Sequence, residues 1–218
     1  MIYSNDRKLA LSGWLKEHNP SSYNSSLKLQ KFLLFYELFS YVNDEPADFF
    51  SLKGYKKGPV FSAVWGDYTK EHEEFIKKSQ EVYLKNRATI NSSYAKRSSF
   101  LTSILSESEL SKLTHALNLW QSKERRILTG EKQVPLDKKD FIRSDKELIC
   151  KLESLYPDDL IDNVIIEHID NKSFLIPKDK VCEFTAEHMD VLMQIAESQE
   201  LYNPVYVDIA DDGGLIID

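Results

Sequence analysis

Cysteine, glycine and proline are all scarce in this sequence. Among 218 residues there are 2 Cys, 7 Gly and 7 Pro. Two thiols, Cys150 and Cys182, cannot build a disulfide framework, so we expect both to be reduced in a cytoplasmic protein. The low glycine and proline content argues against long flexible linkers, and a hydrophobic content of 42% is typical of a folded, soluble chain.

Long apolar runs are also missing. No run reaches the roughly 18 residues that a membrane-spanning helix needs. The start of the sequence, MIYSNDRKLALSG, has no basic region followed by an uninterrupted apolar stretch, so it does not have the pattern of a signal peptide. We therefore expect no membrane partner.

Motifs for catalysis and for metal binding are absent from the sequence. There is no G-x-S-x-G, no P-loop pattern and no G-x-G-x-x-G. The five histidines have no paired metal spacing, and the acidic segment 208–214 has Ala210 where a calcium loop needs an oxygen ligand. The sequence thus predicts no catalytic residue, no metal and no cofactor, and an enzyme whose site is assembled from distant residues stays an alternative.

The charge is distributed unevenly along the chain. Residues 1–151 hold 25 Lys and Arg against 19 Asp and Glu, whereas residues 152–218 hold 3 against 16, for a total of −7. The acidic part can fold back on the basic part or meet a basic partner. Its excess of acid disfavours nucleic-acid binding by the whole chain, because phosphates must be met by cations.

The first 155 residues have helical patterns and predict a mainly α fold, a bundle of about six helices. Residues 5–18 form the first expected helix. Residues 27–42, with Ser26 as the expected N-cap, are apolar on nearly every side, which is typical of a buried central helix. Gly58-Pro59 is expected to open a further helix, with proline at its first position.

The remaining helix signals in this part are capping boxes. Ser106 with Glu109, and Ser144 with Glu147, each precede an apolar run, so each pair predicts a helix start. The polar stretch 86–99 between the expected helices is interpreted as an internal loop. Cys150, on the last of these helices, is expected to be a small buried side chain.

The pattern changes after residue 156. Two β-branched segments separated by Asp170-Asn171-Lys172 predict a hairpin, and 205–209 alternate as a strand. Between them, a helix should turn four apolar side chains inward. We therefore predict a helical domain over 1–155 and an acidic α+β extension over 156–218 with a hairpin and one helix. The inward side chains are Met189, Leu192, Met193 and Ala196.

Two linked motifs carry a family resemblance. LKLQKFLLFYELF (27–39) is followed by KKGPVFSAVWGDY (56–68), and together they resemble the Panacea domain family of SocA-like antitoxins over about a fifth of the chain. In this chain two lysines separate Tyr55 from the Gly-Pro-Val turn. The family-motif positions are Leu29, Gln30, Lys31, Tyr36, Gly58, Pro59 and Val60.

The resemblance implies a mostly helical, Panacea-like fold and a role as antitoxin. Members of the family neutralise unrelated small toxins by direct binding, and many are encoded in prophages. The resemblance implies neither catalytic residues nor a cofactor. It does not extend to the acidic part after residue 156.

Two surfaces are candidates for binding a protein partner. The first is the turn and helix of 54–68, where lysines alternate with aromatic side chains; a solvated face or a surface that stacks nucleic-acid bases are the alternatives. The second is the acidic region 200–218, which could occupy a basic site of a toxin, add a strand to a sheet edge, or be a solubilising end. The candidate residues are Tyr55, Lys56, Lys57, Trp65, Tyr68, Asp208, Asp211, Asp212 and Asp218.

The leading hypothesis is an antitoxin that holds a cognate protein toxin in an inactive, non-covalent complex. A phage or prophage protein that binds a host defence or regulatory protein is the first alternative. A nucleic-acid-binding regulator is the second, and it predicts strongly salt-dependent binding. The sequence leaves the oligomeric state open.

Overall fold

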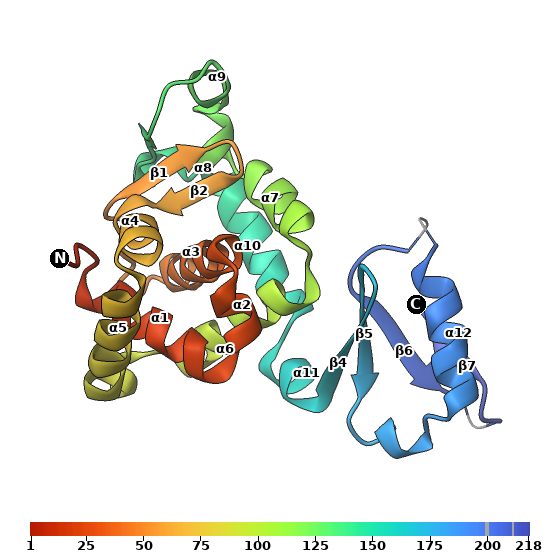
Figure 1. The fold of residues 1–218 in the computed structure, drawn as a ribbon. Coiled ribbons are helices and arrows are strands. Elements are labelled where there is room, and N and C mark those ends of the chain that lie inside the picture. Colours follow the sequence, from red (N-terminus) through yellow and green to blue (C-terminus); the bar gives the residue numbers. More distant parts are fainter. Residues whose placement is uncertain (199–200, 211) are drawn as a thin grey trace.

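The structure is a computed structural model and describes residues 1–198, 201–210 and 212–218. Helices dominate it, so the prediction of a mainly α fold is confirmed (Figure 1). The helix α3 (Ser26–Val42) lies at the centre of the larger part of the molecule, with other helices around it. The other α-helices are α1 (Asp6–His18), α2 (Pro20–Asn24), α4 (Ser62–Lys70), α5 (His72–Asn86), α6 (Ser92–Ile104), α7 (Glu107–His115), α8 (Asn118–Gln121), α9 (Glu124–Leu128), α10 (Arg143–Leu155), α11 (Asp158–Asn163) and α12 (Ala186–Ala196).

The central helix is buried on every side, as its apolar circumference predicts. Phe32 and Phe35 point in different directions from α3, and both are fully buried in the large hydrophobic core. The N-cap is Ser25 rather than Ser26, because the Ser25 hydroxyl accepts a hydrogen bond from the backbone N–H of Lys28 at 3.2 Å. This helix is therefore the frame on which the neighbouring elements are positioned.

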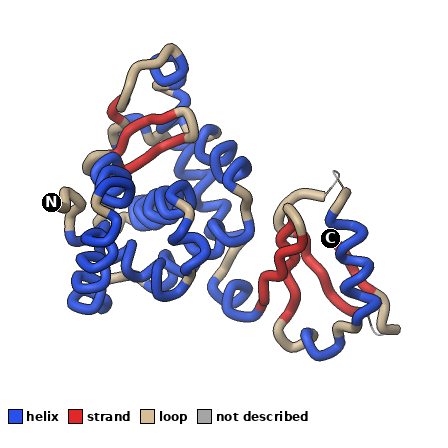
Figure 2. The backbone as a smooth tube through the Cα atoms, in the orientation of Figure 1, coloured by secondary structure: helices blue, strands red, loops and turns tan. Residues whose placement is uncertain are grey.

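Two small sheets lie in different places along the molecule (Figure 2). The first has the order β2-β1-β3 and lies beside the helices. The second has the order β4-β5-β6-β7, and its β5 and β6 are parallel although β4–β5 and β6–β7 are antiparallel. The strands are β1 (Leu52–Tyr55), β2 (Gly58–Phe61), β3 (Val134–Pro135), β4 (Val164–Ile169), β5 (Lys172–Pro177), β6 (Val205–Ile209) and β7 (Leu215–Ile217).

The prediction that Gly58-Pro59 opens a helix is wrong. These residues belong to β2, which pairs with β1 through a two-residue turn at Lys56 and Lys57. Gly58 has φ +106°, a left-handed conformation that does not continue into a right-handed helix. The helix α4 begins four residues later, at Ser62.

The prediction of a loop over 86–99 is also wrong for most of its length. A short 3₁₀ helix (Arg87–Thr89) is followed by α6, whose N-cap Asn91 accepts hydrogen bonds from two backbone amides. Serine made the segment polar in sequence, yet Ser98 is buried together with Tyr94 and Ala95. Small side chains let α6 pack against α3, and this tertiary contact stabilises a helix that its own polarity does not favour.

One predicted capping box is confirmed and the other is wrong. Ser106 and Glu109 cap α7 reciprocally. The helix α10 instead begins at Arg143, and Glu147 there accepts a hydrogen bond from Arg143 Nε at 2.8 Å. Further along α10, Cys150 is exposed, so its expected burial is wrong.

The predicted hairpin, helix and strand after residue 156 are all present. In α12, Leu192 and Ala196 are buried and Met189 is partly buried against a second, smaller hydrophobic core, whereas Met193 is 53% exposed and its predicted inward position is wrong. The strand β6 lies inside the second sheet, with alternate residues Val205 and Val207 in this smaller core. The end of the chain is therefore structured rather than only a solubilising segment.

The second sheet contacts the helices through its other face. Leu175 of β5 belongs to the large core, and Ile166 of β4 packs against it. Arg97 of α6 donates to the Tyr156 carbonyl at 2.8 Å and pairs with Asp158 at 2.9 Å. The acidic part thus folds back on basic side chains at this junction, while the boundary at residue 155 stays a prediction.

Candidate functional site

A groove of about 710 Å³ lies between the β1–β2 turn, α4 and the first turn of α3. Its apolar walls come from Leu27, Tyr55, Val60 and Trp65. The Trp65 side chain is 42% exposed, and its ring lies 6.4 Å from that of Tyr55, centroid to centroid. A partly exposed aromatic pair beside a concavity is typical of a surface that buries area on binding.

The groove is held in shape by the helix behind it. Gln30, buried on α3, accepts a hydrogen bond from the backbone N–H of Phe61 at 2.8 Å and so fixes β2 against this helix. At one end of the groove the Ser25 hydroxyl donates to Glu107 Oε1 at 2.6 Å, which joins the starts of α3 and α7. The site therefore has a rigid floor and does not depend on a loose loop.

Lys31 forms part of the floor and is 1% exposed. Its ammonium group donates to the Lys57 carbonyl at 2.9 Å and to Thr114 Oγ1 at 2.8 Å. Neither acceptor is charged, and burial lowers the pKa of Lys31 to about 7. This lysine therefore ties the β1–β2 turn to α3 and α7 with no compensating carboxylate among the residues that the structure describes.

Gly58 is required by the same arrangement. A Cβ at this position would lie 2.3 Å from Lys31 Nζ and 2.7 Å from Thr114 Oγ1, besides the strain of φ +106°. The turn thus approaches Lys31 as closely as a backbone without a side chain allows. In this structure the Gly-Pro-Val motif belongs to β2, and its backbone passes directly over the buried Lys31.

The back of the turn rests on an aromatic stack. Trp120 Nε1 donates to the Tyr55 carbonyl at 2.9 Å, and the His115 ring stacks on Trp120 with centroids 3.9 Å apart. Burial, together with the charge of Lys31, lowers the pKa of His115. Tyr55 and its neighbouring lysines are therefore presented by a packed support.

The structure brings some of the predicted binding residues together and leaves Tyr68 aside. Tyr55, Lys56, Lys57 and Trp65 all line the groove. The hydroxyl of Tyr68 instead donates to the carbonyls of Tyr23 and Asn24, both at 3.1 Å, and its ring packs against neighbouring aromatics. Tyr68 thus anchors α4 to α2.

The motif positions have mainly structural places. Leu29 is fully buried, and the Tyr36 hydroxyl accepts a hydrogen bond from the Asn91 N–H at 3.0 Å. Pro59 and Val60 line the groove from β2. Of the motif positions, Gln30, Lys31, Pro59 and Val60 therefore line the groove, and the others support the fold around it.

The predicted acidic residues that the structure describes do not line this groove. Asp208 lies on an exposed position of β6, opposite Ile216 of β7, and Asp212 accepts a hydrogen bond from the Gly214 N–H. The backbone of Asp218 pairs with that of Tyr206 at 3.0 Å in both directions. Asp211 lies outside the described residues.

Sequence reasoning missed several residues of the groove. Ser25 and Ser26, Leu27 and Glu107 come from starts of helices that the chain brings to the turn only on folding. The expected N-cap was the neighbouring Ser26 rather than Ser25, and nothing in the sequence pairs α3 with α7. Gln30 and Lys31 were singled out by motif, and their contacts became visible only in the structure.

Two other kinds of site, a metal centre and a membrane-spanning helix, are not found in the part of the chain that the structure describes. No group of three or more His, Cys, Asp or Glu side chains there is placed to hold a metal ion. None of the helices described is both long enough and apolar enough to cross a membrane. Comparisons with protein-family models, with curated proteins and with solved structures give no match.

Proposed function

We propose that this protein is an antitoxin that binds a cognate protein toxin and holds it in an inactive complex without covalent chemistry. The groove beside the β1–β2 turn is the proposed binding surface. The observation that carries the proposal is the exposed Trp65, whose ring packs at a tilt against that of Tyr55 beside a rigid concavity. The resemblance to the Panacea family supports the same function, because both of its motifs contribute residues to this groove.

The proposed mechanism is occlusion. An aromatic side chain that is half exposed in the free protein becomes fully buried when a partner covers it, and such residues dominate the affinity of many interfaces. Since the groove is supported by Gln30 and Lys31, little ordering of the backbone is needed on binding. A toxin held in this way is inhibited as long as the complex persists.

The test begins with affinity capture from the native host and identification of the captured proteins by mass spectrometry. We expect a stoichiometric small protein that arrests growth when expressed alone and is neutralised by co-expression of this chain. The substitution Trp65→Ala should then weaken binding by about 2 kcal/mol or more and abolish growth rescue. Phe50→Ala, which removes a 69% exposed aromatic side chain that does not line the groove and lies outside both candidate surfaces, is the matched control.

Two outcomes would contradict the proposal. If Trp65→Ala and Phe50→Ala rescue growth equally well, the groove is not the toxin-binding surface. If the captured partner is a host defence or regulatory protein that does not arrest growth, the antitoxin role is wrong and the protein acts on that host protein.

A further inference from the structure

The groove has an excess of positive charge as well as apolar walls. Lys31, Lys56 and Lys57 line it, and Glu107 is the acidic residue among its lining. The Glu107 carboxylate is engaged by the Ser25 hydroxyl. The first turn of α3 also faces the groove, so its backbone amides add the positive end of a helix dipole.

Lys31 differs from the other buried cations among the described residues. Lys8 is buried beside Glu37 at 2.5 Å, and Arg97 is buried between Glu153 and Asp158. Lys31 is as deeply buried, but both of its hydrogen-bond partners are neutral. An ammonium group has three N–H donors, so one donor of Lys31 has no acceptor among the described residues. A buried charge of this kind is costly unless it meets an opposite charge.

We propose that the groove receives a carboxylate from an acidic, partly apolar segment of the protein partner. The carboxylate lies over Lys31 and between Lys56 and Lys57, and an adjacent apolar side chain of the same segment packs against Trp65 and Tyr55. Charge complementarity selects this occupant, since Lys56, Lys57 and the protonated form of Lys31 surround an apolar concavity, and the hydrogen-bond acceptors of Lys31 among the described residues are neutral. The inference rests on the proposed function in that it names the chemistry by which the partner is recognised.

The test uses random peptides displayed on phage and selected on the full-length wild-type protein. We expect the enriched peptides to share an Asp or Glu next to a Leu, Phe or Trp. A synthetic peptide of the enriched sequence should bind with an affinity that falls as salt increases, because part of the attraction is between charges. Replacement of its acid by the corresponding amide should weaken binding about tenfold or more.

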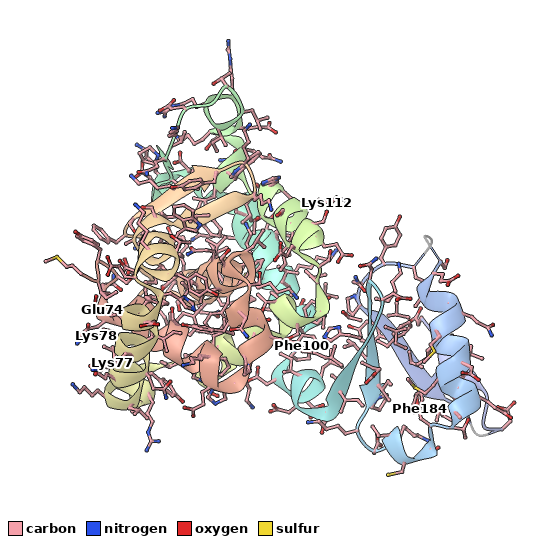
Figure 3. The ribbon with its side chains drawn as sticks, viewed as in Figure 1. Glu74, Lys77, Lys78, Phe100, Lys112 and Phe184 are labelled. Carbon is pink, nitrogen blue, oxygen red and sulfur yellow. The ribbon has the colours of Figure 1, made fainter. Side chains whose placement is uncertain are left out.

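Matched lysine pairs provide the variants. The substitutions Lys56→Gln and Lys57→Gln together remove two exposed charges at the groove, and they should weaken binding about tenfold or more. The control, Lys77→Gln with Lys78→Gln, removes two adjacent exposed lysines from α5, where both point away from the helices (Figure 3). This control variant should bind the peptide with the same affinity as the wild type. Lys31→Met, checked for folding by circular dichroism, should weaken binding at least as much as the turn variant.

Several outcomes would overturn the inference. It is wrong if the enriched peptides carry no acid, if no peptide depends on Lys56, Lys57 and Trp65, or if both lysine pairs have equal effects. Competition of ATP or inorganic phosphate with the wild-type groove, in the absence of any acidic peptide signal, would assign the site to phosphate groups instead. A captured toxin that needs Trp65 but presents no carboxylate would leave the proposed function standing and refute this inference alone.

Discussion

Some single residues in this protein have structural roles that their residue type alone does not predict. Lysine is usually a solvent-exposed residue, but in the folded chain Lys31 connects α3 to the β1–β2 turn and to α7 through hydrogen bonds. Gly58 has its place because Lys31 and Thr114 occupy the space a side chain would need. The same arrangement gives Lys31 a titration that ordinary lysines do not have.

Lys31 should make the stability of the protein depend on pH. Its pKa is about 7 when folded and near the ordinary value of 10.5 when unfolded. Between these values the unfolded chain binds the extra proton, so stability rises with pH; below pH 7 the full penalty of the buried charge is present. We expect the wild type to gain stability relative to Lys31→Met by up to about 1.4 kcal/mol per pH unit in this range.

Chemical denaturation at a series of pH values measures this difference. Thr114→Val is the control, because it removes one hydrogen-bond partner of Lys31 but keeps the titrating group. Its stability should follow the pH dependence of the wild type. Parallel pH profiles of wild type and Lys31→Met would contradict the assignment.

At the scale of elements, polar contacts fix how α1 and α3 pack. Glu37 of α3 is completely buried and accepts hydrogen bonds from Lys8 Nζ at 2.5 Å and Arg7 Nε at 2.9 Å. Its other oxygen accepts from the backbone N–H of Asp48 at 2.8 Å. Burial lowers the pKa of Lys8, while the charges of Glu37 and Asp48 act in the opposite direction.

Removing the Glu37 carboxylate alone should strongly destabilise the folded protein. Glu37→Ala removes the closest partner of buried Lys8 and leaves it the Asp48 carboxylate at 3.4 Å, so we expect a loss of roughly 3 kcal/mol in the free energy of unfolding. The double variant Lys8→Met with Glu37→Leu removes both buried charges and should regain most of that loss. Thermal and urea unfolding measure both effects. A single variant as stable as the wild type would show that this pair does not hold the two helices together.

At the scale of the whole molecule, the acidic end belongs to a sheet. The strand β6 lies between β5 and β7, and Val205 and Val207 help to form the second core. Deleting residues 204–218 should therefore unfold the second sheet and α12, while the large core around α3 stays intact. Hydrogen exchange should increase in β4, β5 and α12 and remain slow in α3.

This expectation changes how the acidic region must be tested as a partner surface. Loss of toxin binding on truncation would report the loss of a sheet as well as of charges. Asp208→Asn and Asp212→Asn remove charge at exposed positions and should leave stability within about 0.5 kcal/mol of the wild type. A loss of toxin binding in these variants, measured by calorimetry, would assign the acidic surface to the interface. Equally fast exchange throughout the truncated chain would instead contradict the separate stability of the large core.

The sequence by itself determined the elements whose signals are local. The all-round apolar pattern of α3, the capping box at Ser106 and the alternation in β6 each depend on a few neighbouring residues, and each was predicted correctly. Tyr55 and Trp65 were selected as binding residues for a local reason too, because aromatic side chains alternate with lysines within the single segment 54–68.

Only the tertiary structure decided the features that depend on distant contacts. Gly58 lies in a β-hairpin rather than at a helix start because Gln30 and Lys31 of α3 form hydrogen bonds to the backbone of that hairpin. The helix α6 forms from a polar segment because packing against α3 compensates for weak propensity. The groove has its shape and charge because the starts of α3 and α7 lie beside the β1–β2 turn. No pattern within one segment of the sequence predicts that these three elements come together.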